Sequence, residues 1–130
     1  MGLLTPGRPK QLHKQKDVAA LRAILNDTSQ VATDRRYAAY ALGDIGDTTA
    51  VADLIAVLPD LDVRSSAAEA LGALGDLRAV GPLMLCAGTQ NAVVEASVHR
   101  ALSRLARRDP EGVRAAVDAF DRRLKESTAS

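Results

Sequence analysis

The stretch AAYALGDIGD at residues 38–47 recurs as AAEALGALGD at residues 67–76, an offset of 29 residues. The similarity continues downstream, where AVADL at 50–54 is matched by AVGPL at 79–83. Self-similarity at a period of about 30 residues predicts that one supersecondary unit is repeated along the chain and stacked on its neighbours.

Each repeat unit has the apolar spacing of two successive helices, i, i+3, i+4, i+7. The two stripes are Ala38, Ala41, Leu42 and Ile45, and then Val51, Leu54, Ile55 and Leu58. Gly46 and Gly75 follow the first helix of their units, where a left-handed residue ends a helix. Asp47 and Asp76 come next and are expected to cap the second helix through their carboxylates. A weaker third copy spans residues 94–120, and a half copy precedes the others at 18–25.

The periodicity therefore predicts an all-α chain, because β-branched residues are far outnumbered by alanine and leucine. Asp109-Pro110-Glu111 supplies a cap, a proline and an acid for the start of the last helix. We expect a single domain over 10–125, with tails at 1–9 and 126–130. The expected helices are 17–26, 32–45, 48–58, 63–74, 78–88, 92–107 and 110–125, with a further short helix at 10–15.

The motif Ala-Leu-Gly-x-Leu/Ile-Gly-Asp, followed by Ala-Val-x-x-Leu, resembles the short HEAT-like repeats of the phycobilin-lyase type over residues 17 to 122. Arg35 and Arg64 stand where that family has an arginine early in the first helix. In the third copy Glu95 is expected at the arginine position, with Ser103 and Ala106 replacing the glycines, as in a terminal repeat. The resemblance implies an α-solenoid of the armadillo type, a right-handed superhelix of antiparallel helix pairs with about three HEAT-like repeats.

The composition supports one compact domain. The 130 residues are 47% apolar and 25% charged, enough to bury a core, whereas aromatic residues are only 2% and tryptophan is absent. The single cysteine, Cys86, excludes an internal disulfide and is typical of a reducing compartment. The longest uncharged stretch, 79–94, is broken by Gly81, Pro82 and Gly88, so we expect no membrane span. The N-terminus has Leu3 and Leu4 but no apolar segment long enough for a secretory signal. The expected localisation is cytoplasmic.

Catalytic and metal chemistry lack candidate residues. His13 and His99 are the two histidines, and neither is followed by glutamate, so the several His-Glu pairs of iron hydroxylases built from such repeats are missing. His99, aligned with Ala39 and Ala68, is expected to point inward, and His13 to face solvent. The residues beside Cys86, Leu85 and Ala87, are uncharged and do not lower the pKa of its thiol. We predict no catalytic residue, no metal site and no cofactor.

Nucleic-acid binding is disfavoured, although basic side chains gather near the C-terminus. The net charge is +1 at pH 7, and residues 17–99 are net acidic between basic ends. No tryptophan is present to line a nucleic-acid cleft of the kind that HEAT-like DNA glycosylases use. The arginines that could serve are Arg100, Arg104, Arg107 and Arg108.

The outward face of the second helices is the expected working surface, because second helices line the concave inner face of such solenoids. Subtracting the inward stripe leaves small, apolar positions exposed there, and an exposed apolar strip rimmed by charge marks a binding site. We predict a non-catalytic protein–protein interaction scaffold, monomeric or weakly self-associating. The expected partner-binding residues are Asp53, Ala56, Pro82, Leu85, Arg114 and Asp118.

Two other functions stay open at this point. A bilin-lyase-like or other enzyme-complex subunit would hold a ligand, such as a tetrapyrrole, for chemistry performed elsewhere. A nucleic-acid binder would use the arginine-rich C-terminal helices. An inert or self-associating alanine-rich face is the alternative to any partner site.

Overall fold

The computed structural model describes residues 8–88 and 91–128, and within them the chain is helical with no strand. Eight α-helices and two short 3₁₀ turns occupy these residues, as the repeat pattern predicts. Their bounds are α1 Arg8–Lys14, α2 Val18–Asn26, α3 Ala32–Ile45, η1 Thr48–Ala50, α4 Val51–Val57, α5 Arg64–Leu74, η2 Leu77–Ala79, α6 Val80–Cys86, α7 Ala92–Arg108 and α8 Pro110–Thr128.

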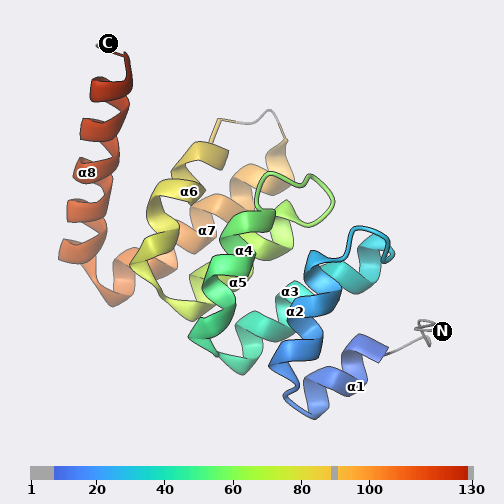
Figure 1. The fold of residues 1–130 in the computed structure, drawn as a ribbon. Coiled ribbons are helices and arrows are strands. Elements are labelled where there is room, and N and C mark those ends of the chain that lie inside the picture. Colours follow the sequence, from blue (N-terminus) through green and yellow to red (C-terminus); the bar gives the residue numbers. More distant parts are fainter. Residues whose placement is uncertain (1–7, 89–90, 129–130) are drawn as a thin grey trace.

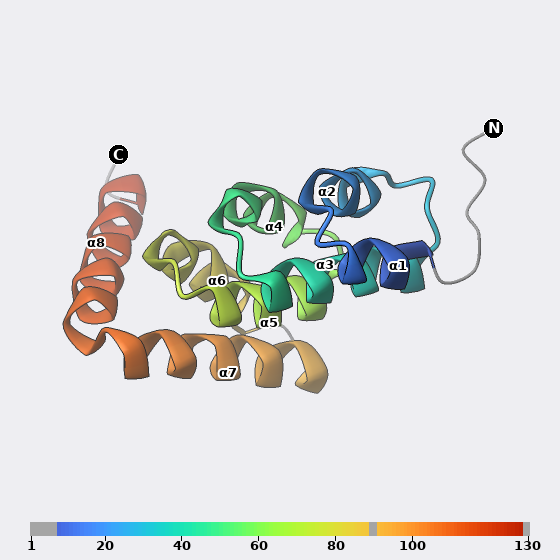
Figure 2. The same cartoon turned by 90° about the horizontal axis from the view of Figure 1, so that it is seen from below.

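The helices form two layers (Figures 1 and 2). The first-helix layer consists of α3, α5 and α7, and the second-helix layer of α2, α4 and α6. The helix α1 packs against α2 and α3 at one end, and α8 rises beside α6 at the other. One continuous apolar core runs between the layers. Its largest fully buried side chains include Leu21, Leu25, Leu42, Leu54, Leu71, Leu83 and Leu105.

The first-helix layer is the more tightly packed one. A Cβ placed on Gly43 would lie 2.8 Å from the Cα of Ala70, and one on Gly72 would lie 2.7 Å from the Cα of Ala101. These glycines therefore let α3, α5 and α7 approach until their backbones touch. The second helices have fewer close backbone approaches, a few between α2 and α4 and fewer still between α4 and α6.

The turns between paired helices have the predicted chemistry. Gly46 (φ 83°) and Gly75 (φ 73°) take the left-handed conformation that ends α3 and α5. Asp47 and Asp76 then accept hydrogen bonds of 2.9 Å from the backbone N–H two residues on, and so cap η1 and η2. Asp109 likewise caps α8 by accepting a 2.8 Å hydrogen bond from the N–H of Gly112.

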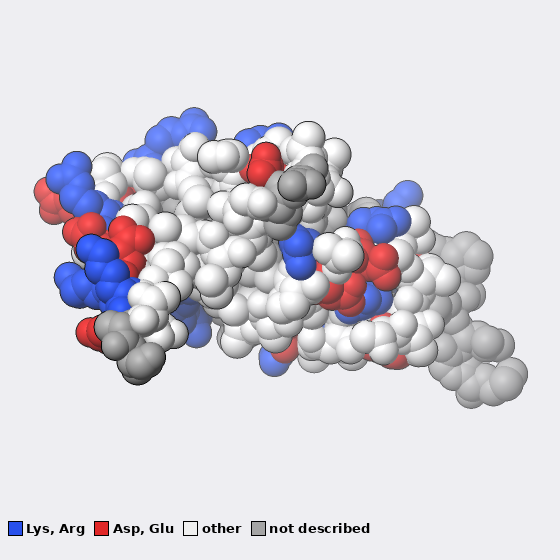
Figure 3. Space-filling model, turned by 90° about the horizontal axis from the view of Figure 1, so that it is seen from above, with Lys and Arg blue, Asp and Glu red and all other residues white. Residues whose placement is uncertain are grey.

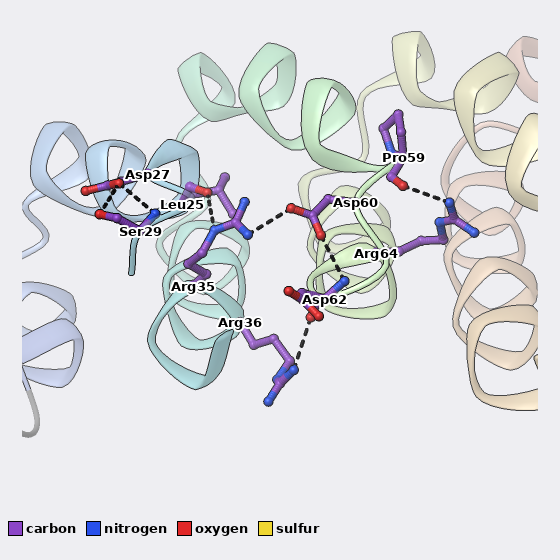
Figure 4. Close-up of polar contacts among 9 residues, drawn as sticks. All are labelled: Leu25, Asp27, Ser29, Arg35, Arg36, Pro59, Asp60, Asp62 and Arg64. Carbon is purple, nitrogen blue, oxygen red and sulfur yellow. Dashed lines mark hydrogen bonds and ion pairs between the residues drawn. The ribbon is translucent and has the colours of Figure 1, made fainter. Parts of the chain in front are cut away.

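Arg35 and Arg64 tie each repeat to the one before it (Figure 4). Arg35, only 3% exposed, donates from Nε to the Leu25 carbonyl at 3.0 Å and from Nη1 to Asp60 at 2.8 Å. Arg64 donates from Nε to the Leu58 carbonyl at 2.7 Å. Each guanidinium thereby satisfies carbonyls at the end of the preceding second helix, which have no partner inside that helix.

The third copy keeps the expected register, an offset of 31 residues from the second. Val94, Val98, Ala101 and Leu105 are buried as Val63, Ala67, Ala70 and Leu74 are. The prediction that His99 points inward is nevertheless wrong, because His99 is exposed. The equivalent face of α5, which includes Gly72, packs on α7, and among the described residues no further first helix follows to cover that face of α7. Glu95 takes the arginine position, so in the described part of the chain no arginine of α7 contacts the end of α6 as Arg64 contacts the end of α4.

The ends of the domain differ in detail from the expected bounds. α1 begins at Arg8, and Pro9, placed in the N-terminal tail by the sequence, is buried in that helix. α8 continues to Thr128, three residues past its expected end, and α6 stops at Cys86, two residues before its expected end. The rest of the expected tails, at 1–7 and 129–130, lies outside the described residues.

Candidate partner-binding groove

Two of the predicted partner-binding residues, Pro82 and Leu85, lie together on α6 at the mouth of an apolar groove. Leu85 is 68% exposed, far more than a leucine buried in the core, and Pro82 is half-buried. The helix register that placed them on the outward face is therefore confirmed. Leu83, on the opposite face of the same helix, is fully buried.

The other wall of the groove comes from α8. Phe120, Arg123 and Leu124 face Gly81, Pro82 and Leu85 across a hollow of about 340 Å³, which we call the α6/α8 groove. Gly81, which has no side chain, forms part of the floor and leaves space above it. A Cβ built there would lie 3.4 Å from Cδ2 of Phe120 and 3.7 Å from Nη2 of Arg123.

The apolar stripe of α8 leads from the core into the groove. Val113, Ala116 and Val117 pack at helical spacing against the core, and Phe120 is buried. Leu124 continues the same stripe one turn further, lines the groove with Leu85 and is 45% exposed. Exposed apolar surface of this kind marks interaction sites.

The groove is apolar on its α6 side and charged on its α8 side. The helix α6, VGPLMLC, carries no charged residue, so Arg123 is the charged side chain of the lining. In the view from above, charged side chains gather over α8 at the left and over the right half of the molecule, with largely uncharged surface between them (Figure 3). A partner that fills this groove must therefore be apolar at its centre and tolerate or match one arginine at the rim.

The remaining predicted partner-binding residues lie elsewhere. Asp53 on α4 accepts hydrogen bonds from Nε of Arg22 and, at 3.0 Å, from Nδ2 of Asn26, so its carboxylate links α4 to α2. Ala56 is exposed on α4, away from the groove lining. Arg114 and Asp118 are exposed on α8 and also outside that lining. The structure thus joins two of the six predicted residues in one hollow.

The α8 half of the groove is absent from the sequence-based prediction. That prediction places Phe120 only in the weak third copy and includes neither Arg123 nor Leu124 among the site residues. The signal is present in the spacing of Val117, Phe120 and Leu124, which continues an apolar face beyond the repeat unit.

A second cluster that the sequence did not reveal lies at the other end of the domain, around His13. Its Nε2 lies 2.7 Å from Oδ2 of Asp44 and its Nδ1 lies 2.9 Å from the Tyr37 hydroxyl. The His13 ring also packs edge-on against Tyr37 and Tyr40, with centroids 5.7 and 5.6 Å away. The expectation that His13 faces solvent is therefore wrong. These contacts attach α1 to α3.

Cys86 is buried on α6, and burial raises the pKa of its thiol, which keeps the group protonated and unreactive at neutral pH. In the part of the chain that the structure describes, histidine, cysteine, aspartate and glutamate side chains form no group of three that could hold a metal ion. Among the same residues, no helix combines the length and apolarity needed to cross a bilayer.

Comparison with known proteins supports the fold. A family model described as HEAT repeats matches residues 18–103, which covers α2 through most of α7. No curated protein matches the chain. The match spans the two clear repeats, the contacts of Arg35 and Arg64 between repeats, and the turns that begin at Gly46 and Gly75, so this chain belongs to the HEAT-repeat family.

Proposed function

We propose that this chain is a non-catalytic scaffold that binds a partner protein in the α6/α8 groove. HEAT repeats typically mediate protein–protein interaction. The observation that supports this site is Leu85, a large apolar side chain that is 68% exposed in a hollow with two further apolar side chains, Phe120 and Leu124. Anchors of protein interfaces sit in apolar pockets of this kind, with charge at the rim.

The lining specifies the chemistry of the partner. An aliphatic or aromatic side chain would occupy the space above Gly81, between Pro82 and Leu124. Arg123 is exposed at the rim, and a carboxylate of the partner next to that anchor would complement its charge. We therefore expect a protein segment with an apolar anchor and a neighbouring acidic residue.

The test compares two exposed leucines. Leu85→Glu places a charge inside the groove, whereas Leu61→Glu places the same charge on the loop after α4, where Leu61 is 76% exposed. Neither change opens a core cavity, so both variants should keep the helical content and cooperative melting of the parent. The partner is first identified by affinity purification from the native cell and mass spectrometry, and its affinity is then measured with purified protein.

We expect Leu85→Glu to weaken that binding by about tenfold or more, and Leu61→Glu to leave it unchanged. Equal affinity of Leu85→Glu and the parent would rule out the α6/α8 groove. Unfolding of Leu85→Glu would instead show that Leu85 belongs to the core. Coloured or tetrapyrrole-bearing material that copurifies in stoichiometric amount would favour a ligand-holding subunit over a protein scaffold.

A further inference from the structure

The first-helix layer carries a second groove, which the proposed function does not use. It crosses α3, α5 and α7 and encloses about 410 Å³. Its floor is made of small residues, Gly43, Ala70, Ala73 and Ala101, because the backbones of these helices touch. We call it the first-helix groove. A floor without large side chains lets an extended segment of chain lie close to the helix backbones.

Charged side chains line this groove in a fixed order. At the α3 edge Asp44 remains 57% exposed while its carboxylate contacts His13. In the middle Glu69 pairs with Arg100 through two N–H groups, and both side chains are about half exposed. At the α7 edge Arg104 is exposed and, among the described residues, has no acidic partner. The groove therefore offers an unpaired positive charge at the α7 edge and an exposed carboxylate at the α3 edge.

This order suits a partner with isolated charges better than a regular polyanion. Single-stranded nucleic acid carries a phosphate on every nucleotide, and such a chain would bring phosphates against Asp44 and Glu69. Tyr40 is the aromatic residue of the lining, so successive bases have no row of rings on which to stack. A peptide can place one carboxylate at Arg104 and one cation at Asp44, with uncharged residues between them.

We propose that the first-helix groove binds an extended segment of a partner protein that carries an acidic residue at the α7 edge and a basic residue at the α3 edge. Arg104 binds the carboxylate of the partner, and Arg100 beside it can exchange its bond to Glu69 for one to the same carboxylate. Asp44 and the exposed ring of Tyr40 bind the cation of the partner. Neighbouring helix axes lie ~8–10 Å apart, so the groove spans ~16–20 Å. An extended chain of ~5–6 residues covers that distance.

The experiment selects ligands from random sequences, so the natural partner need not be identified first. A phage-displayed library of random peptides, about twice the spanning length, is selected on the immobilised whole chain. Only phage that also bind the Leu85→Glu variant are kept, so that ligands of the α6/α8 groove are removed. Enriched sequences are synthesised, labelled and measured by fluorescence anisotropy against the parent and three variants. The variants are Arg104→Gln, Arg122→Gln as a matched control on α8, and Leu85→Glu in the other groove.

We expect enriched peptides to carry an acid and a base separated by ~4–6 residues, and to lose about tenfold or more in affinity with Arg104→Gln. Arg122→Gln and Leu85→Glu should leave that affinity unchanged, which keeps this site separate from the α6/α8 groove. Peptides that bind Arg104→Gln as tightly as the parent, or enrichment without acidic residues, would overturn the proposal. An oligothymidylate of similar length that binds more tightly than the peptides, and is lost with Arg104→Gln, would assign the face to nucleic acid and also overturn it.

Discussion

Gly72→Ala tests the close packing of the first-helix layer with a single methyl group. The new Cβ would lie 2.7 Å from the Cα of Ala101, 3.0 Å from its Cβ and 3.4 Å from its carbonyl oxygen. The nearest atom belongs to the backbone, so no side-chain rotation relieves the clash. The helices α5 and α7 must separate by roughly 1 Å to restore ordinary distances of ~3.5–4.0 Å between carbon atoms.

The cost follows from two opposing contributions. Overpacking a close-packed site costs roughly 1–3 kcal/mol, and α5 and α7 share the most extensive helix interface in the domain, which favours the upper end. Replacing glycine by alanine inside a helix returns about 1 kcal/mol. We expect a net loss of about 2 kcal/mol in the free energy of unfolding, measured by urea denaturation followed by circular dichroism.

Two controls decide whether the close backbone approach is the cause. Gly81→Ala adds the same methyl group where nothing lies closer than 3.4 Å, so its stability should stay within about 1 kcal/mol of the parent. Ala101→Gly in the Gly72→Ala background removes a methyl group but leaves the clashing backbone atom in place, so it should not restore stability. The reasoning is refuted if Gly72→Ala is as stable as Gly81→Ala, or if Ala101→Gly rescues it.

Three further predictions concern the core, the Arg35 contacts between repeats and the stability at acid pH. Leu71→Ala and Leu83→Ala should each cost about 2–5 kcal/mol in urea melts, because both side chains are fully buried, whereas Leu124→Ala should cost less than about 1 kcal/mol at its 45% exposed site. Arg35→Ala should cost about 1–3 kcal/mol or more, since it leaves the Leu25 carbonyl and Asp60 without their guanidinium partner; chemical denaturation at pH 7 checks this. The hydrogen bond from Arg35, followed by that from the Asp62 N–H, lowers the pKa of Asp60 below its ordinary value of 3.8. Its ionised form therefore stabilises the fold above that value, and the stability is lost as the pH falls through the lowered folded-state pKa. Asp60→Asn should be less stable at pH 7 and should lose less stability between pH 4 and lower pH than the parent, as a series of urea melts at fixed pH values would show.

Local signals predicted most of the fold. The expected bounds of α3, 32–45, agree with the structure, and α2, α5 and α7 begin or end within one residue of expectation. Gly46, Gly75 and their following aspartates mark the turns because left-handed backbone and N-capping are properties of single residues. Such features depend on neighbours in sequence and can be predicted without knowing the tertiary structure.

The errors share a different cause, since they depend on contacts between distant residues. His99 is exposed because, among the described residues, no further first helix packs on that face of α7, and helix periodicity does not show where the stack of repeats ends. His13 contacts Asp44, which lies 31 residues further along the chain, only because α1 packs against α3. The hydrogen bonds from Arg22 and Asn26 to Asp53 likewise join two repeats, and the helix period does not predict them.

The candidate groove was half predictable for the same reason. The outward positions of Pro82 and Leu85 follow from the helix period within α6, because their opposite face carries Val80 and Leu83. The contribution of Phe120, Arg123 and Leu124 depends on the angle at which α8 leaves α7, and helix periodicity contains no information about that angle.

The unequal spacing of the two layers determines how this molecule can deform. In the first-helix layer, glycines pack directly against alanines of the next helix. Moving these helices closer together would cause backbone repulsion, and moving them apart would lose packed surface. The second helices have fewer close backbone approaches, and polar side chains such as Asp53, with Arg22 and Asn26, bridge α2 and α4. We therefore expect a change in the curvature of the solenoid to alter the spacing of α2, α4 and α6 more than that of α3, α5 and α7. A ligand on the second-helix layer would respond to that curvature, whereas a ligand in the first-helix groove would meet helices of nearly fixed spacing.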